Sequence, residues 1–508
     1  MSSRIADLSE SMPAVPSARS ATVVLDGFGL GVADVVRLAD GRARPTPAPG
    51  ALLRAQESWN AARRIAATGR VYGRSTGVGA NRNVDVPTEA AAGHGLRLLR
   101  SHAGAIGAEL PARQVRAALA VRANQLLAGG AGLRPSVITA LCEALATGAY
   151  PVVNEFGSVG TGDIAALAQV GLALAGEHPW RGSGAPAPQP LDNNDALALI
   201  SSNALTLGQS ALALHELRGL IGATQVVAAL SLLAVDGSHE AYAAPVHAAR
   251  PHRGSTEVAR RMRELIGAAD RPAPPLGRIQ DPYGFRCLPQ IHGPAHDAAD
   301  ALEEVLAVEI NAAAENPLIA PEDLAAYHHG GFYAAQLALA LDHFRLALTQ
   351  VARLSTSRLS TLNEPACTRL RPFLADHEPA SSGVMILEYA AGAALGDLRA
   401  FSAPASLGHA VLSRGVEEQA SFASLAARQT LRACGAYRLV AGCELVAAVR
   451  ALRQRDLRPD PGLPAGQAFA LAASVLDGDP ADRPLTDDVT AAAALLDRFT
   501  DIWRGSVS

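Results

Sequence analysis

A glycine-rich turn that runs directly into an apolar segment is the feature that most constrains this chain. Gly157, Gly160 and Gly162 lie within six residues, and the apolar residues 164–170 follow almost at once. Glycine accepts the positive-φ backbone of tight bends, and Asp163 stands where a helix N-cap is expected. The pattern therefore predicts a tight loop at the start of a buried helix. The N–H groups of such a helix start favour an anion or an electrophile, although a plain turn before a core helix gives the same pattern.

The composition favours long, closely packed helices. Apolar residues make up 49% of the 508 residues, charged residues 18% and aromatic residues only 4%, with a mean hydropathy of +0.13. Alanine and leucine dominate the apolar share, and both are strong helix formers. A chain of this length can hold several domains, but a single long helical domain also reaches it. We therefore predict an all-α protein with a large core.

Charge and cysteine usage exclude several classes of partner. The net charge of −4 gives no reason to expect nucleic acid as a partner. Residues 1–20 are rich in Ser, Ala and Pro without an apolar run, so we expect a disordered N-terminus and no signal peptide. Apolar runs are interrupted before about 18 positions, which predicts no membrane span. The cysteines are odd in number, without a Cys-x-x-Cys pair, so we expect buried free thiols in a reducing cytoplasm and no metal site: Cys142, Cys287, Cys367, Cys434 and Cys443.

Polar side chains interrupt otherwise apolar or glycine-rich stretches at several places. In a helical core such residues are costly unless they hydrogen-bond to one another or line a cavity. We therefore treat them as candidate site residues. They are Tyr72, His102, Asn203, Gln280, Tyr283, Arg286, Asn316 and Glu417.

Three stretches around these residues resemble the histidine and phenylalanine ammonia-lyase family. Residues 71–79, Val-Tyr-Gly-Arg-Ser-Thr-Gly-Val-Gly, are similar to the family's Tyr-Gly-x-x-Thr-Gly-x-Gly lid. Residues 280–290, Gln-Asp-Pro-Tyr-Gly-Phe-Arg-Cys-Leu-Pro-Gln, are the most specific match, to Gln-Asp-Pro-Tyr-Ser-x-Arg-Cys-x-Pro-Gln. Residues 315–319, Glu-Asn-Pro-Leu-Ile, resemble Asp-Asn-Pro-Leu-Ile. The resemblance covers roughly residues 20 to 430.

The chain departs from the family pattern at the site itself. In the family the glycine loop reads Gly-Ser-Val-Gly-Ala-Ser-Gly-Asp, and its Ala-Ser-Gly cyclises into an imidazolone electrophile. Residues 157–163 form a loop one residue shorter, in which Thr161 alone replaces the Ala-Ser pair. Ser201 stands on the family's asparagine, and Asn203 follows two positions later. Residues 417–419, Glu-Glu-Gln, replace the family's Glu-Asp-His.

The resemblance also implies roles for individual residues. Tyr72 would be the general base on a mobile lid, and Tyr283 would stabilise charge near the electrophile. Arg286 would clamp a substrate carboxylate, a task that suits the planar guanidinium. Lowering a phenol pKa from about 10 to neutrality takes about 4 kcal/mol, which we expect Arg286 and a helix N-terminus to supply in part. The remaining substrate-binding candidates are His102, Asn203, Gln280, Asn316 and Glu417.

The fold implied by the resemblance is a long central helical bundle with a small, mixed N-terminal active-site part. We place that part at residues 21–190 and the bundle with the C-terminal helices at 191–508. Local patterns predict a strand at 22–25, the start of a helix at 31–39, and long helices at 335–360 and 383–400. The resemblance also implies a homotetramer whose active sites draw on three subunits, and we expect the same assembly here.

The leading functional hypothesis is a lyase-family enzyme that uses tyrosine base catalysis on a small carboxylated substrate, without the electrophile and without another cofactor. Its reaction would be an elimination, isomerisation or cyclisation. A second hypothesis is an aromatic amino acid ammonia-lyase with a Thr-derived electrophile. The Gly162 nitrogen would then attack the Gly160 carbonyl, and Thr161 would dehydrate to an ethylidene group. A third hypothesis is an inactive homologue that acts by binding.

Overall fold

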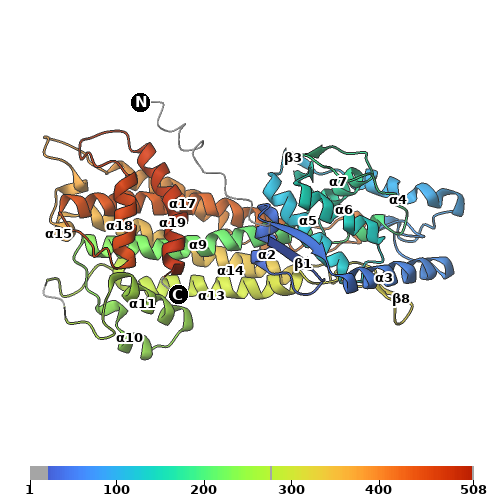
Figure 1. Ribbon diagram of the computed structural model, residues 1–508, viewed down its shortest axis with the longest axis horizontal. Helices are drawn as coiled ribbons and strands as arrows, with labels where there is room; N and C mark the ends of the chain where they lie inside the picture. The colour runs from blue at the N-terminus through green and yellow to red at the C-terminus, as the bar shows by residue number, and fades with distance from the viewer. Residues whose placement is uncertain (1–20, 275–276, 506–508) are drawn as a thin grey trace. The chain divides into compact units, whose positions relative to one another are not determined.

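The computed structural model describes residues 21–274 and 277–505 and divides into two compact units (Figure 1). The predicted disordered N-terminus, residues 1–20, lies outside the described residues. Among the described residues, the first unit contains the chain up to Ala211 together with two later segments, Ala307–Tyr333 and Ala410–Ala420. The second unit contains the described residues of Leu212–Leu306, Ala334–His409 and the chain from Ser421 to Gly505. The predicted active-site part, residues 21–190, thus lies in the first unit, which also takes up segments from far along the chain.

The first unit is mixed, as expected for the active-site part. It holds every strand of the described residues, in two-stranded sheets: β1 (Ala21–Leu25) parallel to β2 (Ala43–Pro47), and the antiparallel pairs β3 (Ile106–Glu109) with β5 (Asn154–Phe156), β4 (Tyr150–Pro151) with β6 (Trp180–Arg181), and β7 (Leu318–Ala320) with β8 (Ala325–Tyr327). Its helices are α2 (Val32–Ala39), α3 (Pro49–Thr68), η1 (Gly79–Asn81), α4 (Thr88–His102), α5 (Ala112–Leu127), α6 (Pro135–Thr147), α7 (Ile164–Leu174), α8 (Ala196–Ile200) and η5 (Ser413–Gly415).

Helices α5 and α7 form the centre of this unit. From Val115 to Leu127 every residue of α5 is buried, including the charged Arg122. Arg122 forms an ion pair with Glu315 at 2.7 Å, and both side chains are 1% exposed. Breaking such a pair leaves an uncompensated buried charge, at a cost of about 3–5 kcal/mol. The ion pair therefore ties the late segment 307–333 firmly to the N-terminal fold.

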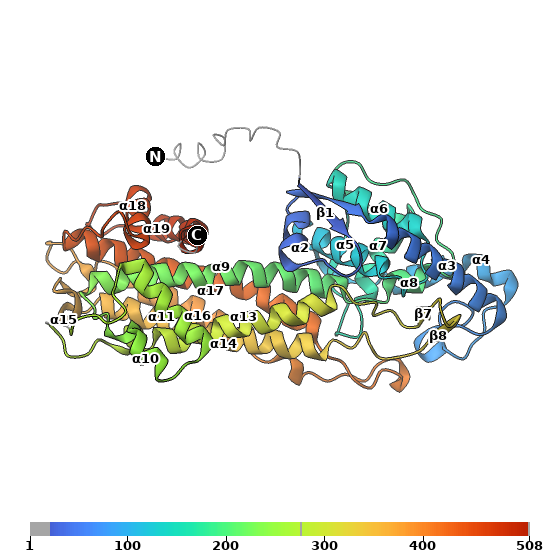
Figure 2. The same ribbon diagram turned by 60° about the horizontal axis from the view of Figure 1, so that its bottom comes forward.

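The second unit is a helical bundle. Its long helices are α9 (Ala204–Ala234, whose first residues belong to the first unit), α13 (Leu288–Glu309), α14 (Ala335–Leu362), α16 (Ile386–Phe401), α17 (Ala423–Gln454), α18 (Pro464–Val475) and α19 (Thr486–Gly505). Shorter elements are η2 (Glu240–Tyr242), α10 (Ala244–Ala248), α11 (Arg253–Ile266), α12 (Tyr283–Arg286), α15 (Pro365–Thr368), η3 (Pro372–Leu374) and η4 (Ala405–Leu407). Figure 2 shows α14, α16 and α17 packed side by side. Small residues such as alanine on their facing surfaces allow this close approach.

The all-α prediction is confirmed, together with the predicted strand and helices near the N-terminus. The helix expected from residue 335 extends to Leu362. The helix expected from residue 383 begins only at Ile386. Gly383 has a φ of +52° and the Val384 N–H donates to the Phe373 carbonyl, so these residues form a turn before the helix starts.

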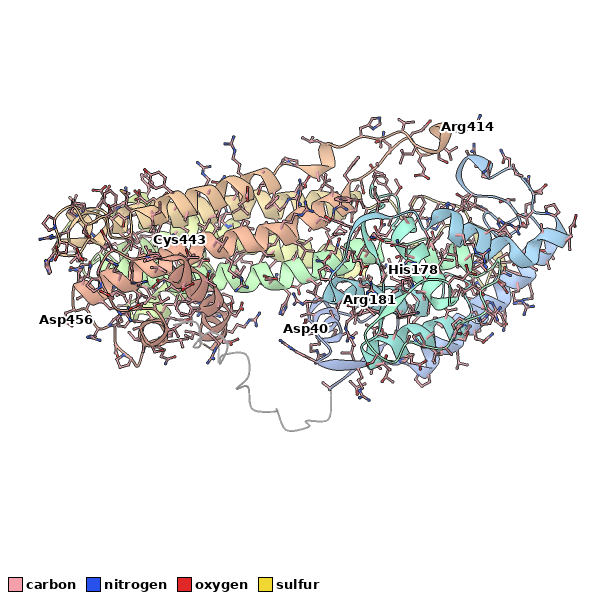
Figure 3. The ribbon with its side chains drawn as sticks, turned by 90° about the horizontal axis from the view of Figure 1, so that it is seen from above. Asp40, His178, Arg181, Arg414, Cys443 and Asp456 are labelled. Carbon is pink, nitrogen blue, oxygen red and sulfur yellow. The ribbon has the colours of Figure 1, made fainter. Side chains whose placement is uncertain are left out.

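Two expectations from the sequence need correction. By length and composition alone, the segment Ala196–Ala234 is apolar enough to cross a membrane, although no such segment was expected. Because 89% of its most apolar window is buried inside the protein, we interpret it as a core helix. All five cysteines are free, but only Cys142, Cys434 and Cys443 are buried, whereas Cys287 and Cys367 are partly exposed. Figure 3 shows Cys443 on α17 in the bundle.

Candidate active site

The first unit contains a cavity of about 540 Å³ that is open to solvent. Its walls come from the loop after Tyr72, the end of α4, the glycine-rich loop before α7, helix α8 and the segment Ala410–Ala420. Segments that are far apart in sequence therefore meet around one space. The polar or titratable side chains in its lining are Tyr72, Asn81, Ser101, His102, Ser158, Thr161, Ser413 and Glu417.

The glycine-rich loop makes a tight turn beside this cavity. Gly160 has a φ of +87° and Gly162 a φ of +107°, a backbone region that side-chained residues rarely adopt. The Ser158 hydroxyl accepts a hydrogen bond from the Gly160 N–H (3.1 Å) and donates one to the Gly162 carbonyl (3.0 Å). The turn thus holds Thr161 between two constrained glycines.

Asn203, rather than Ser201, bonds to this loop. The Gly162 N–H donates to the Asn203 Oδ1 at 3.2 Å, and the Asn203 Nδ2 donates to the Phe332 carbonyl at 2.6 Å. Ser201, which stands on the family's asparagine in sequence, instead accepts a hydrogen bond from the Asn316 N–H at 3.0 Å. The hydrogen bond to the loop is therefore made by Asn203, two residues after the position of the family's asparagine.

Asp163 stands at the N-cap position of α7, but its side chain does not cap the helix. The carboxylate instead accepts hydrogen bonds from the N–H and the hydroxyl of Thr206, both at 2.8 Å. Burial raises the pKa of Asp163, while the Thr206 hydrogen bonds oppose the rise. The predicted helix start is confirmed, and the predicted capping role of the side chain is wrong. Asp163 connects the loop to the start of α9.

The segment Ala410–Ala420 places a carboxylate at the loop. The Thr161 hydroxyl donates to the Glu417 Oε2 at 3.2 Å. The Ser413 hydroxyl accepts a hydrogen bond from the Ala80 N–H at 3.0 Å, so the same segment also contacts the loop that follows Tyr72. Figure 3 marks Arg414 at the exposed turn of this segment. Glu417 therefore lies next to the residue that replaces the family's Ala-Ser pair.

Tyr72 lies in the cavity with its hydroxyl bonded to its own loop. The Gly79 N–H donates to the Tyr72 oxygen at 2.8 Å, and the tyrosine ring meets the ring of His328 edge-on at 6.3 Å. Burial raises the pKa of Tyr72, and the negative charge of Glu417 raises it further. The Gly79 hydrogen bond and Arg82 oppose that rise but do not cancel it. The expected lowering of the Tyr72 pKa is therefore not found in this unit, because desolvation outweighs the favourable contacts.

The loop that carries Tyr72 is anchored close to the tyrosine. Arg74 is 2% exposed and donates to the carbonyls of Ala131 (2.7 Å) and Gly132 (3.3 Å) and to the Asn194 Oδ1 (3.3 Å). Burial lowers the pKa of this guanidinium to about 10. Removing a buried, hydrogen-bonded arginine from its partners costs free energy. Any lid motion of this loop is therefore expected to leave residues 72–74 in place and to move the residues that follow.

His102 presents a defined tautomer at the end of α4. Its Nδ1 lies 2.8 Å from the Leu98 carbonyl oxygen. A carbonyl can only accept, so the neutral ring carries its proton on Nδ1 and leaves the lone pair on Nε2. His102 can therefore accept a hydrogen bond from a substrate through Nε2.

The remaining candidates do not line this cavity. Asn316 accepts a hydrogen bond from the His329 N–H at 3.0 Å through its Oδ1, within the first unit. Gln280, Tyr283 and Arg286 belong to the second unit. There the Arg286 guanidinium lies 4.4 Å from the centre of the Tyr283 ring, and its Nε donates to the Asp281 carbonyl at 2.6 Å. Tyr283 is 69% exposed.

Sequence reasoning missed Ser158 and Ser413 and misjudged Asp163. Ser158 gave a signal, because a serine two residues before a glycine turn can bond to its backbone. Ser413 gave none, because its partner Ala80 lies 333 residues away. Among residues 21–274 and 277–505, no group of three or more His, Cys, Asp or Glu is arranged to hold a metal ion.

Known proteins of similar sequence and structure identify the family of this chain. The profile of a family described as aromatic amino acid lyase matches residues 30–474. The histidine ammonia-lyase of Geobacillus kaustophilus is 35% identical over 442 residues, which cover 84% of this chain and 87% of that protein.

The chain belongs to the aromatic amino acid lyase family. Two solved structures of similar fold cover nearly the whole chain. The histidine ammonia-lyase of Trypanosoma cruzi aligns with a TM-score of 0.87 at 26% identity, over 96% of this chain and 95% of that one. Ergothionase from Treponema denticola, an ergothioneine-degrading enzyme in complex with desmethyl-ergothioneine sulfonic acid, aligns with a TM-score of 0.88 at 26% identity, over 95% of this chain and 99% of that one. The chain is accordingly a lyase-family enzyme.

The contact between Asn203 and the loop yields the first prediction. Asn203→Ala removes the acceptor of the buried Gly162 N–H, at a cost of about 1–3 kcal/mol for the unsatisfied donor. We expect hydrogen exchange in residues 157–163 to accelerate by about tenfold or more, as measured by mass spectrometry. Ser201→Ala is the matched control, because it removes the acceptor of the Asn316 N–H without touching the loop. Equal exchange of the loop in both variants would show that Asn203 does not hold it.

Proposed function

We propose that this chain catalyses proton abstraction from a small carboxylated substrate, with Tyr72 as the base and without the family's electrophile. The observation that carries the proposal is the cavity itself. Tyr72, Thr161 and Glu417 line it together, and Thr161 stands alone where the family has an Ala-Ser pair. The site thus keeps the base and has lost the parent tripeptide of the electrophile.

The residues present do not fit the imidazolone. Ring closure needs the Gly162 nitrogen to attack the Gly160 carbonyl, and that nitrogen donates its hydrogen to Asn203. The Gly162 carbonyl is held by the Ser158 hydroxyl. We infer that these hydrogen bonds on both sides of Gly162 favour an ordinary peptide over ring closure. The missing residue also changes the turn that would bring nitrogen and carbonyl together.

The proton chemistry follows from the groups in the cavity. Ionised Tyr72 takes a proton from a substrate carbon. In an elimination, the electron pair of that C–H bond forms a double bond to the adjacent carbon, and the leaving group departs with the electrons of its own bond. In an isomerisation, the same pair forms the new double bond and Tyr72 returns the proton to another atom of the substrate. Glu417 holds the Thr161 hydroxyl, which leaves that hydroxyl's lone pairs available to a substrate donor. His102 offers a second acceptor through its Nε2. Arg286, from another copy in the homotetramer we propose, would bind the carboxylate in bidentate fashion.

The absence of the electrophile restricts the substrate. An α-ammonium group is a poor leaving group, and the neighbouring β-proton is only weakly acidic. A site of this kind therefore requires a substrate with a more readily departing group, or an isomerisation or cyclisation that releases none. One solved relative is an ergothioneine-degrading enzyme, so this fold is not confined to ordinary amino acids as substrates. We further propose that the enzyme acts in the cytoplasm.

A second candidate function is histidine ammonia-lyase activity with a Thr-derived electrophile. It is favoured by the 35% identity to the histidine ammonia-lyase of Geobacillus kaustophilus. The third hypothesis, an inactive binding homologue, finds less support, because Tyr72, Tyr283 and Arg286 are all retained.

The state of residues 160–162 is decided by intact mass. We expect the measured mass of the purified chain to equal that calculated from its sequence. Cyclisation with dehydration would remove two waters, about 36 Da. A mass lower by that amount, located by peptide mapping to the fragment with Thr161, would overturn the proposal and support the second candidate. Thr161→Ala serves as control, because alanine has no hydroxyl to lose.

Tyr72 gives the second functional prediction. Tyr72→Phe keeps the ring in place and should lower turnover by roughly 10²-fold or more, the scale of general-base loss. Because burial and Glu417 raise the pKa of Tyr72, the wild-type rate should rise about tenfold per pH unit through neutrality and into the alkaline range. Glu417→Gln removes the negative charge and should shift this rise to lower pH. A wild-type rate that is flat from pH 7 to 9, with turnover retained in Tyr72→Phe, would assign the base elsewhere.

Substrate class is tested with amino acids directly. We expect little or no release of ammonia from histidine, phenylalanine or tyrosine. The assay measures the ultraviolet absorbance of the urocanate- or cinnamate-type product. Robust turnover of any of them would favour the ammonia-lyase hypothesis. Arg286→Ala should in addition abolish the binding of a carboxylate ligand found by thermal-shift screening, and unchanged binding would refute the clamp.

A further inference from the structure

Helix α12 carries Tyr283 and Arg286 but is too short to satisfy its own backbone. It spans four residues, and the last carbonyls of any helix lack partners within it. Two of these carbonyls are satisfied by buried side chains from distant elements. The Tyr242 hydroxyl donates to the Phe285 carbonyl at 2.9 Å, and the Arg358 Nη1 donates to the Gly284 carbonyl at 3.4 Å. The orientation of α12 is therefore set from outside the helix.

Arg358 is itself held in one position. Its Nε and Nη2 donate to the Glu444 Oε1 (2.6 Å) and Oε2 (2.8 Å), a bidentate pair with both side chains fully buried. The hydroxyls of Ser231 (2.7 Å) and Ser355 (2.5 Å) donate to the two oxygens of the same carboxylate. These residues come from α9, α14 and α17, so the guanidinium is fixed by three long helices of the bundle.

The backbone of α12 also packs directly on this arginine. A Cβ added at Gly284 would lie 3.0 Å from the Arg358 Cγ, closer than most real contacts of that kind. Tyr242, on the other side, is fully buried. The short helix thus rests on Arg358 through Gly284, while Tyr283 on its outer face is exposed.

We propose that Tyr242 and the buried Arg358–Glu444 pair are positioning residues, which fix α12 so that Tyr283 and Arg286 are presented in one orientation to the substrate. Their role in catalysis rests on the proposed function, in which Arg286 binds the substrate carboxylate. Their role in fixing α12 stands on the contacts above and is testable without turnover.

The test compares two buried tyrosines. Tyr242→Phe removes only the hydroxyl that bonds to α12. Tyr437→Phe is the matched control, because Tyr437 is equally buried and its hydroxyl donates at 2.6 Å to Thr224, on another helix of the bundle. Both variants should lower the melting temperature of the full-length protein by a similar few degrees. Only Tyr242→Phe should accelerate hydrogen exchange in the peptide that covers residues 281–287, by about fivefold or more.

Unchanged exchange in Tyr242→Phe, or equal acceleration in both variants, would overturn the proposal. Gly284→Ala provides a second route to the same question. The added methyl group would lie 3.0 Å from the Arg358 Cγ, and because Glu444 holds Arg358 in place, we expect α12 to shift and exchange there to accelerate. With any substrate that the enzyme converts, the KM of Tyr242→Phe should be several-fold higher than that of Tyr437→Phe. If exchange responds as expected but KM does not, the positioning of α12 holds and the assigned role of Arg286 fails.

Discussion

The architecture of the candidate site depends on how one short loop is held at the start of α7. The Gly162 N–H is bound by Asn203, the Gly162 carbonyl by Ser158, and the Asp163 carboxylate by Thr206. Each partner satisfies a backbone or side-chain group that would otherwise be buried without one, so each is costly to remove. Thr161 is fixed at the cavity because its neighbours are fixed, and its hydroxyl can therefore meet Glu417.

The electrostatics of the cavity have a consequence for the base. Tyr72 is partly buried with the negative charge of Glu417 nearby, and both its burial and that charge raise its pKa. A phenol in this position stays protonated at neutral pH in the unliganded site. A bound cation or the arrival of a positively charged group would counter both effects. In the homotetramer we propose, Arg286 of another copy is the natural candidate.

The two units hold the candidate residues in different ways. The first unit contains the cavity, with an anchored tyrosine loop and a late segment that carries Glu417. The second unit contains Tyr283 and Arg286 on a short helix, whose carbonyls accept hydrogen bonds from Tyr242 and Arg358. A buried ion pair such as Arg358–Glu444 is weak evidence for added stability, since two apolar residues can often replace it. The hydrogen bond from Arg358 to the Gly284 carbonyl fits better with the role we propose for the pair, which is to fix the orientation of α12.

The sequence by itself determined the helical class, the glycine loop before α7 and four of the polar side chains that line the cavity, Tyr72, His102, Thr161 and Glu417. These features are local: alanine and leucine favour helices, glycines permit positive φ, and the motifs of the lyase family lie within short stretches. Tertiary structure decided which side chain meets which. Asn203 rather than Ser201 reaches the loop, Asp163 bonds to Thr206 instead of capping α7, and Ser413 supports a loop 333 residues away. The raised pKa of Tyr72 also comes from packing, because desolvation depends on what surrounds the ring and no local pattern in the sequence records it.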